Sequence, residues 1–552
     1  MTNVNMSYKD LVKIIGEPVP QDEILEKVPL IGSDIGDNIP GTDEMTIEFF
    51  PNRPDLYSVE GLGRALRQFL GFKPGLIEYD VEPSGIKAVV TPEVKDVRPY
   101  FVCCAVTGVT IDDTALRSIM ELQEKLHITL GRKRAKLAIG VHDLDKVTPP
   151  FTFTVKDPDS FSFVPLAKTE NMTMREILQK HEKGKAYAHL MEGYDKFPVI
   201  LDSKGDVLSF PPIINGALTT VTVNTKNIFI DVTGFDANAV ENALNIVATA
   251  LVERGGKIRS VEMEGAPKKV YPDLTPEERT VDMADFRRII GLDISAEEAV
   301  KALGLMGMGA SADGDKIKVF VPAYRTDILH DIDICEDVAI GYGYNNYGKK
   351  RSTVTQTNGK LLPETEFSAS VQDIMIGLGY TEITTLTLSN HRDEFEISGL
   401  PEVDSVTLVN PITEDHTCLR SYLMPSLMRI LRHNKHRDLP QKIFEVGYVI
   451  REKKNILHLC ALQASSRSSF TEVKSLAESI LRELGAEYTI SACTYSTFLP
   501  GRGAFIEIKG EKVGVFGEMA PKIITDYEMT HPVTMVELDL SGLIADRTGG
   551  LF

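Results

Sequence analysis

The chain has 552 residues, of which 43% are hydrophobic and 25% charged, a composition typical of folded globular proteins and not of disordered chains. This length is sufficient for three or four domains. The formal net charge of -19 opposes non-specific attraction to nucleic acid or anionic membranes. Any RNA contact would therefore use local basic runs such as residues 131–136 and 429–438, although such runs are also typical of solvated surfaces.

The amino-terminal segment and the cysteines exclude further classes of protein. The start MTNVNMSYKD is polar, and no stretch approaches the roughly 20 apolar residues that span a bilayer, so we expect a cytoplasmic protein without membrane contact. The six cysteines show no C-x-x-C spacing, which argues against a zinc ribbon or a disulfide framework. We expect reduced and mostly buried thiols.

One short pattern occurs twice along the chain. The strings VNMSYKDLVKIIGEPVPQDEI, at 4–24, and VDMADFRRIIGLDISAEEAV, at 281–300, each predict a short amphipathic helix that ends at Ile-Ile-Gly. Gly16 and Gly291 stand where a helix end requires a left-handed residue. These similarities favour a duplicated module, the alternative being a chance likeness of two amphipathic helices.

Residues 49–71 read FFPNRPDLYSVEGLGRALRQFLG, in which two prolines stiffen a loop before a helix. Ser58 is suited to begin this helix and Gly71 to end it. We interpret the polar residues of the segment as a packing motif without chemistry. They are Asn52, Arg53, Asp55 and Glu60.

Residues 90–265 alternate short apolar strands with turn signals and predict a mixed sheet. Asp231 and Thr233 lie two residues apart on one strand and therefore project from the same face. Together with Ser209 and Asn215 they are candidates for a polar pocket, although strand-end polar residues are commonly structural. His142 is a possible contributor, with a structural role as the commoner alternative.

No Ser-His-Asp arrangement is evident in this region, and no obvious nucleophile. A hydrolytic site here would use a positioned water, with polar groups that stabilise the oxyanion.

Residues 321–347 concentrate acidic side chains in one segment, which predicts a helix beginning at Thr326. At 3.6 residues per turn an apolar stripe forms from Ile328, Ile332, Cys335 and Ala339. The acids fall at the helix start and on its opposite side, and they are Asp327, Asp333, Glu336 and Asp337. Oxygen ligands of this kind suit Mg²⁺, whereas a solvated acidic face is the alternative.

A polar linker, GKKRSTVTQTNGK, precedes residues 360–545, where the pattern of helices and strands predicts an antiparallel core. An ATP site in such a core would require an arginine in the strand KIFEVGYVI, at 442–450, but this strand offers Glu445. We therefore expect a core that is silent in nucleotide chemistry.

Several of these strings resemble the beta subunits of phenylalanine–tRNA ligases, of the shorter archaeal or eukaryotic kind. They are NRPD with the following EG, the run from Arg325 through Glu336-Asp337 to Gly-Tyr-Gly-Tyr, LVNPITEDHTCLRSYLMPSLMRILRHN, and KIFEVGYVI. The resemblance covers nearly the whole chain.

The resemblance implies an α+β multidomain fold. Its parts would be a B1-like domain at 1–85, a B3/B4 mixed-sheet editing domain at 90–265, a B5 domain at 270–347 and a class II synthetase-like non-catalytic core, B6/B7, at 360–545. B1 and B5 would be small helical or winged modules and related to each other.

It further implies a partner alpha subunit in an α2β2 tetramer, tRNA(Phe), ATP bound by the alpha subunit, and Mg²⁺ held by Asp327, Asp333, Glu336 and Asp337. The pocket of Ser209, Asn215, Asp231 and Thr233 would hydrolyse tyrosine that is wrongly attached to tRNA(Phe). Two other classes stay open, namely a free-standing aminoacyl-tRNA deacylase and a non-enzymatic RNA-associated scaffold.

Overall fold

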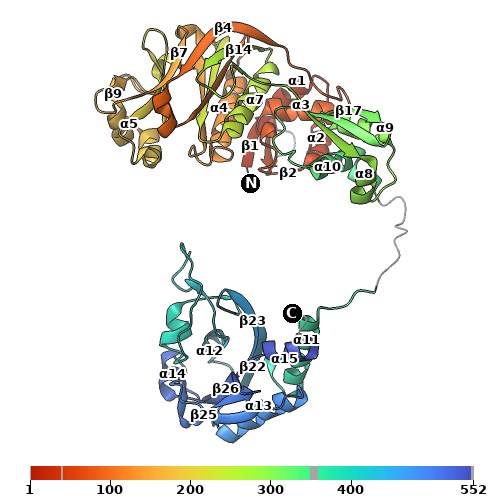
Figure 1. Ribbon diagram of the computed structural model, residues 1–552, viewed down its shortest axis with the longest axis vertical. Coiled ribbons are helices and arrows are strands. Elements are labelled where there is room, and N and C mark those ends of the chain that lie inside the picture. Colours follow the sequence, from red (N-terminus) through yellow and green to blue (C-terminus); the bar gives the residue numbers. More distant parts are fainter. Residues whose placement is uncertain (1, 39–41, 348–357, 549–552) are drawn as a thin grey trace. The chain divides into compact units, whose positions relative to one another are not determined.

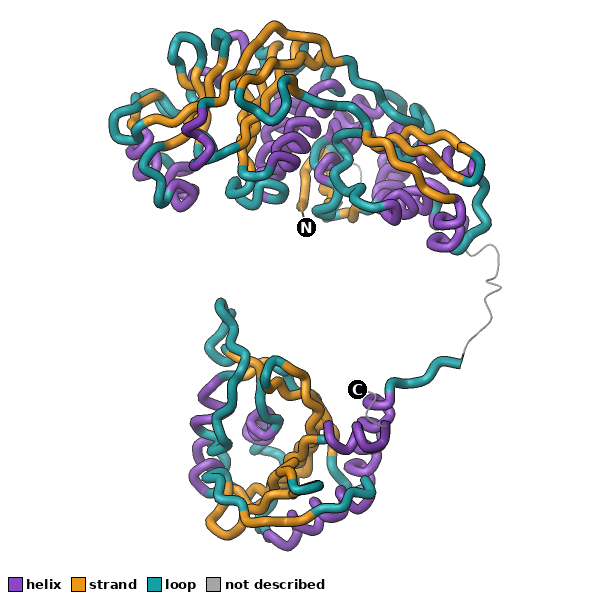
Figure 2. Tube along the Cα trace, in the orientation of Figure 1, coloured by secondary structure: helices purple, strands orange, loops and turns teal. Residues whose placement is uncertain are grey.

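The computed structural model describes residues 2–38, 42–347 and 358–548, and the chain divides into two compact units, 1–353 and 354–552 (Figures 1 and 2). Helices and several separate sheets occur in both units, as expected for a mixed α+β multidomain protein. Most of the expected linker, 348–357, lies outside the described residues. Within the described ranges, no helix has the length and apolar character needed to cross a membrane.

The amino-terminal module contains a three-stranded antiparallel sheet in the order β1-β3-β2. Ser7 caps its first helix by accepting a hydrogen bond from the Asp10 amide, and Gly16 ends that helix with a φ of 84°. The elements are β1 (Thr2–Ser7), α1 (Tyr8–Ile15), α2 (Gln21–Lys27), β2 (Ser33–Ile35), β3 (Glu44–Phe49) and α3 (Val59–Phe69). As expected, Ser58 caps α3 by accepting from the Gly61 amide.

A second small module repeats this plan. Its sheet has the corresponding order β16-β18-β17, and its first helix also ends at a left-handed glycine, Gly291. Arg53-Pro54-Asp55 begins four residues after β3 ends at 49, and Arg325-Thr326-Asp327 four residues after β18 ends at 321. Shared topology and spacing therefore support the duplication. The elements are β16 (Glu277–Asp282), α8 (Met283–Ile290), α9 (Ala296–Leu305), β17 (Gly309–Asp313), β18 (Lys316–Val321) and α10 (Asp331–Tyr342).

The sequence between the two modules forms a ten-stranded mixed sheet, with the order β12-β11-β10-β7-β4-β14-β5-β13-β6 and β15 beside β14 (Figure 1). The pairs β14–β4 and β4–β7 are parallel, whereas β13 runs antiparallel to both of its neighbours. The strands are β4 (Val81–Val90), β5 (Tyr100–Thr107), β6 (Leu137–Asp143), β7 (Phe151–Lys156), β10 (Phe197–Leu201), β11 (Val207–Phe210), β12 (Ile214–Asn215), β13 (Asn227–Gly234), β14 (Lys257–Glu264) and β15 (Val270–Tyr271).

Two long helices pack with this sheet. They are α4 (Asp113–Ile128) and α7 (Ala237–Val252), and α7 contacts β5 and β13. A short hairpin follows β7, with β8 (Ser162–Phe163), β9 (Met172–Thr173), α5 (Met174–Lys180) and α6 (Glu182–Tyr187). Strand β13, which lies between β5 and the edge strand β6, is buried along nearly its whole length, so any polar side chain on it must find a partner inside the protein.

A buried ion network joins the amino-terminal module to the sheet. Arg254, which follows α7, donates to both oxygens of Asp10 at 2.7 Å and to Glu60 Oε1 at 2.6 Å. Ser118 of α4 donates to the other Glu60 oxygen at 2.7 Å. Glu60 belongs to the 49–71 segment, so this geometry supports the interpretation of that segment as a packing motif.

The carboxyl-terminal unit is built on a seven-stranded sheet in the order β19-β22-β23-β27-β26-β25-β24. The expectation of a wholly antiparallel sheet is wrong at one edge, because β19 runs parallel to β22. The strands are β19 (Thr381–Glu382), β22 (Gln441–Arg451), β23 (Lys454–Ala464), β24 (Thr489–Ala492), β25 (Phe498–Ile508), β26 (Glu511–Met519) and β27 (Val533–Asp539).

Two apolar clusters form the interior of this unit. The helices are α11 (Pro363–Gly377), α12 (Met424–His433), α13 (Phe470–Glu483), α14 (Pro521–Asp526) and α15 (Ser541–Thr548). All six cysteines of the chain are free and buried, which confirms the expected thiols.

Replacing Arg254 with Met should destabilise the first unit by about 3–5 kcal/mol, because Asp10 and Glu60 would stay buried without a cation. The matched control is Arg259→Met, which removes a more exposed ion pair with Glu82 and should cost less than about 1 kcal/mol. Urea unfolding followed by circular dichroism measures both. Equal effects of the two substitutions would show that the Arg254 network contributes no special stability.

Candidate functional site

A small polar hollow opens beside β13, and three of the four residues predicted for a pocket line it. Ser209 of β11 pairs directly with Asn215 of β12, and Asp231 of β13 lies across from them. This hollow, of about 20 Å³, shares part of its wall with a larger cavity of about 350 Å³. The shared wall residues are His127, Arg134, Ile139, Ile214 and Asn215.

The fourth predicted residue, Thr233, is bound differently. Its hydroxyl accepts a hydrogen bond from Arg98 Nε at 2.8 Å, and its carbonyl accepts one from Arg98 Nη2 at 2.9 Å. Burial lowers the pKa of Arg98, and the charge of Asp231 opposes this shift. Thr233 is therefore tied to a buried guanidinium and is not part of the wall of the hollow.

Three polar atoms of the wall are buried without a hydrogen-bond partner among the residues that the structure describes. They are the Ser209 hydroxyl, His127 Nδ1 and Arg134 Nε. An unsatisfied buried polar group costs roughly 1–3 kcal/mol, so such groups are uncommon unless a ligand or water satisfies them. Their position in the wall indicates a binding site.

Asp231 has a partner that the sequence did not identify as one. His142 Nε2 lies 2.6 Å from Asp231 Oδ2, and His142 Nδ1 lies 2.7 Å from the hydroxyl of Thr219. All three side chains are buried. His142 thus has a structural role, as expected, and the group that it contacts is the candidate site residue Asp231. Thr219 had no signal in the sequence beyond its residue type.

Arg134 shapes the wall from the end of the loop after α4. Its Nη1 donates to the carbonyls of Pro212 and Ile213, at 3.3 and 2.8 Å, and its Nη2 donates to Glu124 at 3.1 Å. Arg134 belongs to the basic run 131–136, in which Arg132 and Lys133 are exposed. The run therefore has one residue in the cavity wall and others at the surface.

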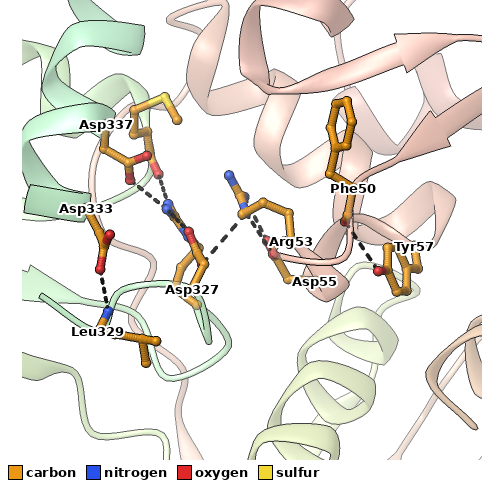
Figure 3. A network of polar contacts seen from close by, with 10 residues as sticks. Phe50, Arg53, Asp55, Tyr57, Asp327, Leu329, Asp333 and Asp337 are labelled. Carbon is orange, nitrogen blue, oxygen red and sulfur yellow. Dashed lines mark hydrogen bonds and ion pairs between the residues drawn. The ribbon is translucent and has the colours of Figure 1, made fainter. Parts of the chain in front are cut away.

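Asp327 and Asp337 of the acidic segment contact the buried guanidinium of Arg325, whereas Asp333 turns toward Leu329; the three acids are labelled in Figure 3. Arg325 donates to both oxygens of Asp327, at 2.9 and 2.7 Å, and to Asp337 at 2.6 Å. Burial raises the pKa of Asp337 although Arg325 opposes this. Burial also acts to raise the pKa of Asp327, but the charge and hydrogen bonds of Arg325 bring it below its ordinary value.

Two sequence predictions for this segment are wrong. Helix α10 begins at Asp331, not at Thr326, because the pairing of Arg325 with Asp327 fixes the preceding residues in a loop. The apolar stripe is also rotated, since Ile332 is 56% exposed whereas Asp337 is only 4% exposed. Asp333 turns back to accept from the amides of Leu329 and His330, at 2.8 and 2.7 Å.

The four predicted magnesium ligands do not converge in this arrangement. Asp327 and Asp337 face Arg325, Asp333 binds backbone amides, and Glu336 is exposed. Within the described residues there is no group of three or more His, Cys, Asp or Glu side chains placed to hold a metal ion. The residues as folded therefore do not fit a preformed magnesium cage, and magnesium binding stays a prediction.

His127 should make folding sensitive to acid. Its Nε2 accepts from the Ile139 amide at 2.8 Å, and burial lowers its pKa to about 4 although Glu124 opposes the shift. The folded state thus keeps a neutral ring that the unfolded chain protonates below its ordinary value of 6.5. Stability is fully present above pH 6.5 and should fall by up to about 3 kcal/mol as pH drops toward 4.

The comparison is with His127→Gln, whose amide oxygen can accept the same hydrogen bond but does not titrate. Urea unfolding between pH 7.5 and 4.5 should show a steeper loss of stability in the wild type than in this variant. Parallel curves would exclude His127 as the source of the acid sensitivity.

The chain matches known proteins along nearly its whole length. Family models match at 111–262 ("B3/4 domain"), 279–344 ("tRNA synthetase B5 domain") and 349–540 ("Phenylalanyl tRNA synthetase beta chain CLM domain"). The phenylalanine–tRNA ligase beta subunit of Methanosarcina acetivorans is 45% identical over 99% of this chain and 100% of its own length.

The corresponding protein of Archaeoglobus fulgidus is 44% identical over 98% of both chains. The crystal structure of an N-terminal fragment of the Pyrococcus horikoshii phenylalanyl-tRNA synthetase beta subunit matches with a TM-score of 0.60 and 40% identity, covering 62% of this chain and 100% of the fragment. On sequence, domain order and structure together, this chain belongs to the family of phenylalanine–tRNA ligase beta subunits.

Proposed function

We propose that this chain works with an alpha subunit in the ATP-dependent attachment of phenylalanine to tRNA(Phe). The observation that carries this proposal is similarity to beta subunits over at least 98% of the chain, the carboxyl-terminal unit included. We assign ATP binding and aminoacylation to the alpha subunit. In β22, where a phosphate-binding arginine would be needed, Glu445 is buried in an ion pair with Arg420 at 2.9 Å.

We further propose that the small hollow beside β13 and the larger cavity that shares its wall form one site, which hydrolyses tyrosine wrongly attached to tRNA(Phe). A pocket that accepts phenylalanine rejects poorly an amino acid that only adds a hydroxyl, so a second site that binds this hydroxyl supplies the missing selectivity. The larger cavity, of about 350 Å³, has the size of a small-molecule pocket. Ser209 and Asp231 would recognise the hydroxyl, while a positioned water attacks the ester.

The basic run 131–136 is a candidate contact for the tRNA backbone. Arg132 and Lys133 are exposed next to Arg134, and Lys183 also lines the larger cavity. Phosphate contacts of this kind position a nucleic acid without reading its sequence. They would compensate locally for the net charge of -19.

A free-standing deacylase would require only the sheet between residues 81 and 271. The matches across the acidic segment and the carboxyl-terminal unit favour the subunit role instead. An α2β2 assembly and a cytoplasmic location stay predictions.

Replacing Asp231 with Ala should separate the two proposed activities. The complex of the full chain with its alpha subunit should charge tRNA(Phe) with phenylalanine equally well for the wild type and for Asp231→Ala. Hydrolysis of Tyr-tRNA(Phe) should fall roughly 10- to 100-fold, because a hydrogen bond to a charged group is lost. Asp145→Ala, at an exposed position in the turn that follows β6, is the matched control.

If the wild-type complex does not charge tRNA, the subunit role fails. If it charges tRNA but Asp231→Ala hydrolyses Tyr-tRNA(Phe) at the wild-type rate, the pocket is not the editing site.

We also propose that Mg²⁺ binds at the exposed part of the acidic segment, with further ligands beyond the four acids. Glu336→Gln removes one carboxylate without touching the Arg325 network and should weaken Mg²⁺ binding about 10-fold. Asp313→Asn, at an exposed acid of β17 outside the acidic segment, is the control and should leave the affinity unchanged. Calorimetry on the complex measures both. Identical affinities for wild type, variant and control would leave the acids with structural roles alone.

A further inference from the structure

A chain of two short hydrogen bonds lies behind the hollow. It runs from the Thr219 hydroxyl to His142 Nδ1, at 2.7 Å, and from His142 Nε2 to Asp231 Oδ2, at 2.6 Å. Thr219 and Asp231 are each 1% exposed and His142 is fully buried. Thr219 belongs to the wall of the larger cavity and Asp231 to that of the small hollow, so the imidazole links the two compartments.

One end of this chain is set by Asp231, because an ionised carboxylate can only accept, so His142 Nε2 donates to Oδ2. Thr219 has one hydroxyl proton, and its other possible acceptors, the carbonyls of Leu208 and Gly216, are both 3.4 Å away, whereas Nδ1 is 2.7 Å away. On this geometry we assign the hydroxyl proton to the contact with Nδ1, so that the ring carries its own proton on Nε2.

The packing around this pair depends on a missing side chain. Gly140 of β6 lies opposite Asp231 in the sheet. A Cβ at Gly140 would stand 1.9 Å from Asp231 Oδ2 and 2.5 Å from His142 Nε2. No side chain is compatible with both distances, so glycine at this strand position is required for His142 to reach Asp231.

The two carboxylate oxygens of Asp231 differ in their hydrogen-bond partners. Oδ2 is held by His142, whereas Oδ1 accepts no hydrogen bond from the residues in the described ranges. His142 contacts only one of the two oxygens, so it orients the carboxylate without covering both oxygens as a bidentate arginine would. Asp231 therefore keeps a strong acceptor available on the side of the hollow.

We infer that His142 is a positioning residue, supported by Thr219, which fixes Asp231 so that its free oxygen accepts the phenolic hydroxyl of a tyrosyl group. This inference rests on the proposed editing function and names the groups that give the site its selectivity for tyrosine. A tyrosyl group would donate to Asp231, whereas a phenylalanyl group would leave the buried carboxylate oxygen unpaired.

Two substitutions of His142 separate the two ends of the imidazole. In His142→Gln the side-chain amide reaches about as far as Nε2 and can still donate to Asp231, whereas in His142→Asn it reaches only about as far as Nδ1. With the full chain in complex with its alpha subunit, kcat/KM for hydrolysis of Tyr-tRNA(Phe) should fall roughly 10- to 100-fold in the Asn variant. It should stay within about threefold of wild type in the Gln variant.

Hydrolysis of Phe-tRNA(Phe) provides a second readout, because a purely structural defect would lower the hydrolysis of both substrates. It should change less than about threefold in both variants, so that the Tyr-to-Phe ratio collapses only in the Asn variant. In the Asp231→Ala background, His142→Asn should produce no further loss, because the imidazole acts through that carboxylate. Equal losses in both His142 variants, or a full additional loss in the Asp231→Ala background, would overturn the inference.

The proton assignment has its own test, independent of editing. Nitrogen-15 NMR of histidine-labelled protein should show His142 as a neutral ring protonated on Nε2, assigned by the signal lost in His142→Gln. A ring protonated on Nδ1 would overturn the inference even if editing is active. Conversely, a wild-type complex without Tyr-tRNA hydrolysis but with the Nε2 tautomer would refute the editing function and leave only the hydrogen-bond chain.

Discussion

The pairing of buried charges is the constraint on which residues 2–347 depend. Arg254 and Arg325 each meet two carboxylates. Removal of Arg254 would leave Asp10 and Glu60 buried without a cation, and removal of Arg325 would do the same to Asp337. Asp10 and Arg254 are 244 residues apart in the chain, so their pairing joins segments that local structure alone would leave separate. Arg53 with Asp55 repeats in the first module what Arg325 with Asp327 does in the second.

The candidate site also contains a buried carboxylate with a partner, but the partner is of a different kind. Asp231 is as buried as Asp10, yet its partner is an imidazole and not a guanidinium. An arginine bound to both oxygens occupies each of them, whereas a single imidazole donor leaves the other oxygen available to a ligand. Thr233 lies two residues further on the same face, but its hydroxyl accepts a hydrogen bond from Arg98, so its role is structural. Small differences in partner thus separate structural polar residues from binding residues on one strand.

Features that depend on neighbours in the chain were predicted well. The helix ends at Gly16 and Gly291 and the cap at Ser58 follow from local backbone preferences, and all three occur. The acidic segment was misassigned because helical periodicity places Asp337 on the solvent side. An arginine from the preceding loop lies against it instead, and burial with a cation is not visible in a periodic pattern.

The amino-acid sequence by itself determined the family resemblance, the mixed α+β class and a short set of candidate residues, because these depend on strings and spacings along the chain. It grouped Ser209, Asn215, Asp231 and Thr233 as one pocket, of which the first three line the hollow. Only the tertiary structure showed that His142 and Thr219, which are 77 residues apart, support Asp231, and that two of the four predicted metal ligands face Arg325. The physical reason is that hydrogen-bond partners across a sheet are set by strand order and register, which bring distant residues within 3 Å of each other.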